Sequence, residues 1–209
     1  EHTSRGLGDV YKRQAQGVSN QIFFSEYAEG SSNNKYLEIY NGSGSDIDLS
    51  QYVIASCSNG CGDNTSWDYP ENITFEGGTV VSAGDVYVIA HPSADAAILA
   101  QADYTGFLYL SNGDDAFGIV NASTGQIIDI IGDRGPDPGD GWDVAGVTAA
   151  TKDHTLVRKG SVEQGNSDWA SSSGADAASS EWIVYDQNTW DYLGAVSYTH
   201  LTLPTRLPV

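Results

Sequence analysis

Short apolar and aromatic segments, separated by clusters of Gly, Asn, Asp and Ser, recur along the chain and constrain its fold more than any other feature. The first two, residues 21–27 and 36–40, flank the turn-forming string EGSSNN. Segments of this kind are typical of strands, and their close spacing favours a sandwich or barrel over alternating strands and helices. We therefore predict an all-β fold. The other predicted strands are residues 52–55, 73–75, 86–91, 107–110, 116–120, 127–131, 155–158 and 182–185.

The connections between these segments contain few helical signals. The string SNGDD at residues 111–115 predicts a tight hairpin, because Asn-Gly tolerates the positive φ angles of such turns. Residues 94–102 are the one predicted helix, with Ser93 as its N-cap. Residues 164–180 are predicted as a long surface loop whose Trp169 returns to the core. The expected fold thus has one short helix and long loops.

The two ends of the chain differ in character from the residues between them. Residues 1–14 and 196–209 contain the strings YKRQ and SYTHLTLPT, which resemble translated library-adapter sequence, and such non-native segments are left out of fold reasoning. A natural tail is the alternative, since chain ends often lack fixed structure. Under both interpretations residues 15–195 are the predicted domain. The first one leaves room for further natural sequence on both sides.

Charge excludes one class of function. The chain has a formal net charge of −19, and residues 15–195 hold 26 of its 28 acidic residues but five of its nine basic ones. Affinity for nucleic-acid phosphates comes from Lys and Arg, so we expect no direct nucleic-acid binding. The sequence contains no apolar run of the length that a transmembrane helix needs, and no membrane span is predicted.

The string FFSEYAEGSSNNKYLEIYN near the start and the string EWIVYDQNTWDYLG near the end are long and distinctive. With three shorter strings between them, over residues 21–194, they resemble the bacterial lamin tail domain family. The resemblance implies an immunoglobulin-like β-sandwich, secreted or displayed at the bacterial cell surface, often beside extracellular nucleases or phosphatases. It does not imply catalysis. Animal lamin tails bind proteins and chromatin, but the acidic body argues against carrying DNA binding over. The strings occupy residues 23–41, 84–95, 110–120, 155–159 and 181–194.

Cys57 and Cys61, in the string SCSNGCG, are the two cysteines of the chain. Their spacing allows a disulfide that closes a small loop, for which the chain-entropy argument gives about 2 kcal/mol. Such a bond would pin a local loop and would agree with export. Zinc and free thiols are the alternatives. A zinc site wants four ligands, whereas His91 and His154 are isolated in sequence and no second cysteine pair exists.

Residues 132–143 are the densest acidic stretch of the chain. Carboxylates on a backbone bent by Gly and Pro are ligands that calcium accepts, although the spacing departs from an EF-hand because Gly135 stands at a ligand position. A solvated acidic turn next to Arg134 is the favoured interpretation, since acidic loops without metal are common in acidic proteins. The candidate calcium ligands are Asp133, Asp137, Asp140 and Asp143.

Sequence motifs of catalysis are absent. The chain has no G-x-S-x-G elbow, no H-E-x-x-H string and no phosphate-binding loop. His91 and His154 flank predicted strands without a nucleophile motif, which favours structural roles. We predict a protein that is not an enzyme.

Aromatic residues suggest a second kind of site. Five Trp and twelve Tyr offer enough rings to line a sugar-binding face, although sandwich cores bury several such rings. Trp67 and Tyr69, two residues apart in a predicted loop, form the best candidate for an exposed pair that stacks on a glycan. Burial of both rings in the core is the alternative.

The sequence and the resemblance together predict a non-catalytic extracellular interaction module of a larger secreted or surface bacterial protein. Its expected partner is a protein or an envelope or matrix component, with a glycan as a further candidate and no cofactor unless calcium binds. The alternative function is an accessory domain of a secreted nuclease or phosphatase whose catalytic domain lies outside this chain. A calcium-stabilised adhesion domain is a third hypothesis.

Overall fold

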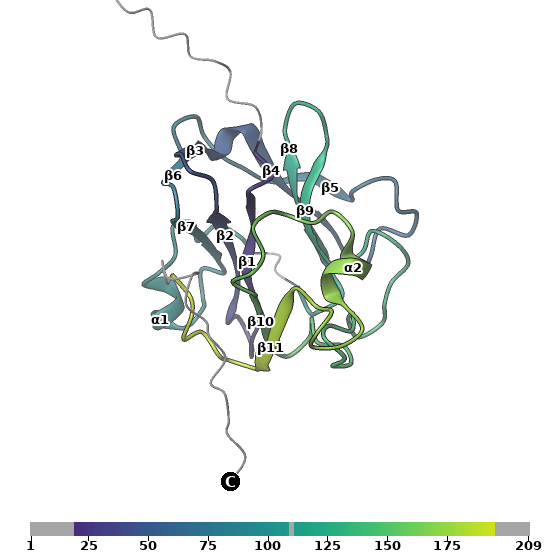
Figure 1. Ribbon diagram of the computed structural model, residues 1–209. Coiled ribbons are helices and arrows are strands. Elements are labelled where there is room, and N and C mark those ends of the chain that lie inside the picture. Colours follow the sequence, from purple (N-terminus) through teal and green to yellow (C-terminus); the bar gives the residue numbers. More distant parts are fainter. Residues whose placement is uncertain (1–18, 109–110, 195–209) are drawn as a thin grey trace, which may run out of the picture.

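The computed structural model describes residues 19–108 and 111–194, which form an immunoglobulin-like β-sandwich (Figure 1). Most of its longer strands carry runs of apolar side chains, and several of them are buried along their whole length. The strands are β1 (Ile22–Glu29), β2 (Lys35–Asn41), β3 (Ile47–Asp48), β4 (Tyr52–Cys57), β5 (Tyr69–Thr74), β6 (Val80–Val81), β7 (Val86–Ala90), β8 (Ala116–Asn121), β9 (Ile127–Ile131), β10 (His154–Arg158) and β11 (Trp182–Asp186).

The strands form two main antiparallel sheets. One sheet has five strands in the order β11-β10-β1-β2-β7, and the other has four in the order β5-β4-β8-β9. A short ribbon of β3 and β6 makes a third, two-stranded sheet. Strands distant in sequence are thus neighbours in space: β1 lies between β2 and β10. The fold is all-β, as the segment spacing predicted.

The main core lies between the two sheets. Phe24, Tyr27 and Leu37 of the five-stranded sheet pack there with Ile54 and Phe117 of the four-stranded sheet. Phe24 and Tyr27 are three positions apart, and an odd difference in position would place them on opposite faces of a regular strand. The pairing of β1 with β2 shifts between Phe24 and Glu26, and this irregularity turns both rings inward.

A second apolar layer covers the outer face of β1, β2 and β7. The short helix α1 (Ala96–Leu99) places Ile98 against this face, and Leu193 near the end of the described chain joins it. The five-stranded sheet is consequently buried on both sides in this region, and every residue of β1 is buried. The other buried members of the layer are Ala28, Tyr36, Val88, Ala90 and Ala94.

The predicted strand at residues 107–110 and the hairpin after it were wrong. Both edges of β8 are occupied, by β4 on one side and β9 on the other, so no edge is left for a hairpin partner. Phe107 lies outside regular secondary structure but is buried. Its ring packs edge to face on that of Phe117, with the ring centres 5.9 Å apart. Tyr109 and Leu110 lie outside the described residues. The apolar character of Phe107 therefore reflects core packing.

The helices also differ from the prediction. Helix α1 is shorter than residues 94–102, and its N-cap is Asp95, whose carboxylate accepts the N–H of Ala97. The predicted surface loop contains a second helix, α2 (Trp169–Ser173), capped by Asp168. Trp169 is buried in the core, as expected. None of the helices in the described part of the chain has the length and apolar character needed to cross a bilayer.

Candidate binding site

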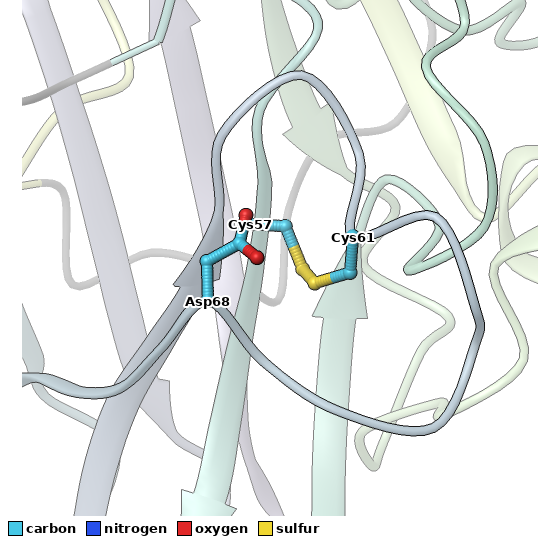
Figure 2. A group of neighbouring side chains, drawn as sticks. All are labelled: Cys57, Cys61 and Asp68. Atoms are coloured by element: carbon cyan, nitrogen blue, oxygen red, sulfur yellow. A yellow bond between two sulfur atoms is a disulfide. The ribbon is translucent and has the colours of Figure 1, made fainter.

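The disulfide closes the loop that follows β4. Cys57 and Cys61 are joined, as their spacing predicted, with their Cα atoms 5.1 Å apart (Figure 2). The carboxylate of Asp68 lies beside the two sulfurs and accepts the N–H of Ser58 at 3.0 Å. Zinc binds cysteine as the thiolate, and two sulfurs bonded to each other offer none. The bond therefore fixes a loop and leaves these three groups without metal-binding chemistry while it is intact.

Two other loops pack against the disulfide loop. Asn59 donates its N–H to the carboxylate of Asp115 at 2.8 Å, and Gly62 donates to the carbonyl of Gly135 at 2.9 Å. Gly60 has a φ of 71°, and a side chain there would begin 2.6 Å from the carbonyl oxygen of Gly135. Only glycine fits this conformation and this close approach. The loops after β4, before β8 and after β9 thus form one packed unit.

The acidic stretch after β9 is not assembled as a cation site in this structure. Among the described residues, the one group of carboxylate, thiol and imidazole atoms close enough to share a metal ion is that of Cys57, Cys61 and Asp68. The four predicted aspartates are exposed and serve local turns instead. Asp133, Asp137 and Asp143 accept the N–H groups of Gly135, Gly139 and Ala149, and Asp140 pairs with Lys152 at 2.6 Å.

Trp67 and Tyr69 are placed in different surroundings. Trp67 is half-buried on the outer face of the four-stranded sheet, where its ring covers Gly118 and the Arg134 guanidinium lies 5.3 Å from the ring centre. A side chain at residue 118 would begin 2.6 Å from this ring, so the glycine makes room for it. Tyr69, the first residue of β5, is 54% exposed. Of the predicted pair, Tyr69 is the ring that is open to solvent.

Tyr69 stands at the rim of a recess of about 640 Å³ between β5 and the segment that precedes β8. This volume falls in the range of small-molecule sites. Leu108 is also at the rim and is 56% exposed, while buried Phe117 and the disulfide-bonded Cys57 contribute to its lining. Exposed apolar side chains around a concavity are typical of a binding surface.

Polar groups complete the recess. Ser56, Asn72, Asn112 and Asp115 all line it. Asn72 donates to the hydroxyl of Ser56 at 2.7 Å, which fixes the orientation of its amide. Burial raises the pKa of Asp115, and the N–H of Asn59 opposes that shift. The recess therefore combines apolar walls with hydrogen-bond donors and acceptors, as ligand-binding sites do.

The two histidines hold local hydrogen bonds. Nδ1 of His91 accepts the N–H of Ser93 at 3.0 Å, and Nδ1 of His154 lies 2.6 Å from the carbonyl oxygen of Lys152. Neither residue lines the recess. These contacts fit the structural roles that the sequence favoured.

Sequence reasoning found Tyr69 and the disulfide but missed the rest of the recess. Leu108, Asn112 and Asp115 precede β8, whereas Asn72 lies within β5, so no local spacing connects them. Asp115 was interpreted as a hairpin residue. A signal was present in the apolar Leu108, which the absence of a strand at this position leaves exposed.

Comparison with known proteins gives one family match. A family model of the Lamin Tail Domain matches residues 15–134, which is more than half of the chain. No curated protein matches the chain. Among solved structures, the crystal structure of a DUF4876 family protein from Bacteroides thetaiotaomicron is similar with a TM-score of 0.40 and 13% sequence identity, over 81% of this chain and 69% of that one.

Proposed function

Because the chain belongs to the lamin tail domain family, a family of non-catalytic immunoglobulin-like domains, we propose that it is a binding module of a larger secreted or surface-displayed bacterial protein. Its partner is a protein or a component of the envelope or extracellular matrix, held at the recess beside the disulfide. The observation that carries the proposal is the exposure of Tyr69 and Leu108, 54% and 56%, on the rim of a concave surface. Proteins seldom expose grouped apolar side chains without a binding role.

The disulfide supports the extracellular part of the proposal. Cys57 and Cys61 are the chain's two cysteines, and the structure pairs them. Structural disulfides form and persist in oxidising compartments, whereas cytosolic thiols are kept reduced. The bond also holds the loop that forms one wall of the recess, so it contributes to the shape of the proposed site.

The contacts of the basic side chains argue against nucleic acid as the partner. Lys35, Lys152 and Arg158 form ion pairs with carboxylates of the same chain, and the pair of Lys152 lies at the surface. Lys159 donates to backbone carbonyls, and Arg134 donates to the carbonyl of Thr65 while its guanidinium lies over an indole ring. Every basic residue of the described chain is therefore engaged, and none is left to neutralise phosphates.

The direct test is cosedimentation of the labelled full chain with envelope fragments and extracellular matrix from a panel of bacteria. We expect binding by the parent and about tenfold weaker binding by a Tyr69→Ala/Leu108→Ala variant, a loss that corresponds to about 1.4 kcal/mol. Val80→Ala is the matched control, because Val80 is 51% exposed and does not line the recess. Absence of binding by the parent, or equal binding by all three proteins, would contradict the proposal.

The alternative of an accessory domain in a secreted nuclease or phosphatase makes the same prediction for this chain alone. In both cases the purified chain is expected to turn over neither DNA nor a phosphoester. Turnover that purifies with the chain and tracks its concentration would overturn the non-catalytic assignment.

A further inference from the structure

We propose that the recess beside the disulfide is a site for a neutral saccharide, in which the ring of Tyr69 stacks on a sugar ring while Asn72, Asn112 and Asp115 bind its hydroxyl groups. This inference rests on the proposed function and names the chemical class of its ligand. Four features carry it: an exposed aromatic ring, a facing apolar wall, a set of amides with one carboxylate, and the charge of the surrounding surface.

Tyr69 supplies the platform. Its residue pairs with Ser56 in the ladder between β4 and β5, so the backbone that carries the ring is held in a sheet. An aromatic side chain has two torsions and loses little conformational entropy when it is covered. The faces of pyranose rings present C–H groups that pack on aromatic planes, and Tyr69 is 54% exposed at the rim of the recess. Leu108 lies at the same recess and offers a second apolar contact.

The polar groups suit hydroxyls, which donate and accept at once. Asn72 already donates to Ser56 at 2.7 Å, so its carbonyl oxygen is directed by that bond and accepts from a ligand. Asn112 is exposed and brings a complete amide. One oxygen of Asp115 accepts the N–H of Asn59 at 2.8 Å, which fixes a carboxylate with further acceptor capacity. Amides and a carboxylate together match the alternating donor and acceptor needs of neighbouring sugar hydroxyls.

Charge selects among saccharides and against peptides. Asp114 lies next to Asp115, the residues from 15 to 195 hold 26 acids against five bases, and all five bases are engaged within the fold. Uronate, sulfated and phosphorylated sugars would meet uncompensated negative charge. A cationic peptide is the competing ligand, but the recess is lined by one carboxylate and by several neutral amides and hydroxyls. This composition favours neutral hydroxyl groups over ammonium or guanidinium groups.

The experiment uses the full chain on an array of neutral hexasaccharides, with cellulose, laminarin, xylan, mannan and chitin types, beside oligogalacturonate and an oligolysine peptide. We expect binding to at least one neutral member and none to oligogalacturonate. The best ligand is then titrated by calorimetry. Tyr69→Ala should weaken it about tenfold or more, a loss of about 1.4 kcal/mol per tenfold, because the ring face on which the sugar stacks is removed. Tyr69→Phe should stay within about twofold, because the ring face is retained.

Two further variants separate the site from the fold. Asn112→Ala should weaken binding severalfold, whereas Val80→Ala, at an equally exposed position outside the recess, should leave it unchanged. All substituted side chains are exposed, so circular dichroism and melting temperature are expected to match the parent. Equal affinity of Tyr69→Ala and the parent would overturn the proposed site, as would preferential binding to oligogalacturonate or oligolysine.

Treatment of the envelope material distinguishes failure of this inference from failure of the proposed function. If a saccharide is the ligand, cosedimentation survives digestion of the material with protease and is lost after enzymatic removal of its glycans. If protease abolishes binding and no neutral array member binds, the partner is a protein: the saccharide inference then fails and the proposed function stands. If the parent binds no envelope or matrix material at all, the proposed function itself fails.

Discussion

Two clusters of buried carboxylates, one joining β9 to β10 across the two sheets and one within the five-stranded sheet, are stabilised in opposite ways. In the first, Arg158 and Asp129 are both fully buried, and the guanidinium donates to both carboxylate oxygens at 3.1 Å. The same guanidinium donates to Glu181 at 2.7 Å and lies 4.4 Å from the ring centre of Trp182. Asp129 also accepts the N–H of Phe24, in the part of β1 that β10 does not pair. The charges of this cluster are compensated by each other.

The second cluster contains no cation. Glu26 and Glu38 are 1% and 2% exposed, beneath the layer formed by α1 and the segment around Leu193. Glu26 accepts the hydroxyl of Tyr36 at 2.5 Å, and Glu38 has the hydroxyl of Ser25 at 2.6 Å and the N–H of Gly194 at 2.7 Å. In the described chain no Lys or Arg forms an ion pair with either carboxylate.

The difference shows that burial alone does not decide the protonation of an acid. Burial raises the pKa of Glu38 to about 7. The hydrogen bonds from Ser25 and Gly194 lower this pKa, and the charges of Asp103 and Asp85 raise it by smaller amounts. Burial likewise raises the pKa of Glu26 well above its ordinary value, and neighbouring Glu38 and Asp191 raise it further. At Asp129 burial raises the pKa, but the guanidinium and two backbone N–H groups oppose that shift. In the first cluster a cation thus opposes the effect of burial on the pKa, whereas no Lys or Arg of the described chain pairs with the carboxylates of the second.

Removing the cation from the first cluster should have the largest effect. Arg158→Met retains much of the side-chain volume but leaves Asp129 buried without a compensating charge. Breaking a buried pair from one side costs about 3–5 kcal/mol, so we expect a loss of this size in the free energy of unfolding from urea titrations.

The matched control is Lys152→Met, which breaks an ion pair whose side chains are 40% and 78% exposed. Exposed pairs contribute little, so this variant should unfold at the same urea concentration as the parent. Adding Asp129→Asn to Arg158→Met should recover part of the loss, because the unpaired charge is then gone. Equal stability of Arg158→Met and Lys152→Met would mean that the first cluster is not held by charge compensation.

The second cluster should make stability fall as pH rises. Glu38 has a folded-state pKa of about 7 and an ordinary value of 4.5, so the folded state binds the proton more tightly than the unfolded chain does. Its contribution is complete below the ordinary pKa and is lost as pH rises through about 7. A shift of this size corresponds to about 3 kcal/mol, measured by urea titrations between mildly acidic and mildly alkaline pH.

Glu38→Gln separates this effect from other titrations. The amide is close in shape to the protonated carboxyl and satisfies the Ser25 and Gly194 contacts, so the pH dependence of the variant should be shallower. Asp63 affects stability in a different pH range. The N–H of Thr65 lowers its pKa to about 2, so its contribution to stability is lost only as pH falls through acidic values. A pH slope that Glu38→Gln leaves unchanged would assign the dependence to other groups.

The sequence predicts the sandwich well and these clusters not at all. Short apolar runs between turn-forming residues located β8 and β9, because both the runs and the turns are local features of the sequence. Glu26 and Glu38 lie on strand positions that face away from the main core, where an acid is normally solvated. They are nevertheless buried. Gly194 donates its N–H to Glu38, and Ile98 and Leu193 pack in the apolar layer on the outer face of these strands, although both segments are distant from Glu26 and Glu38 in sequence. The recess was missed for the same reason, since residues of β4, β5, β8 and the segment before β8 line it together.

The disulfide stabilises a third acidic region. Its removal should lower the free energy of unfolding by less than the loss of Arg158 or the deprotonation of Glu38. Cys57→Ala/Cys61→Ala opens a five-residue ring, for which chain entropy gives about 2 kcal/mol in urea titrations. The pH dependence should remain that of the parent, because Glu38 lies in the other sheet. The parent in reducing agent should behave like the variant. A much larger loss, or a changed pH slope, would mean that the disulfide stabilises the whole sandwich.

Calcium should have the smallest effect on stability. The acids after β9 are exposed, so water already solvates their charges. Asp133, Asp137 and Asp143 each already accept a backbone N–H, and Asp140 pairs with Lys152. A ligand that binds only the folded state raises the melting temperature, so equal values in EDTA and in millimolar calcium are the expected result. Magnesium at the same concentration is the control for screening of the net charge of −19. A rise specific to calcium, lost in Asp137→Asn, would show that the loop gathers its carboxylates around the ion.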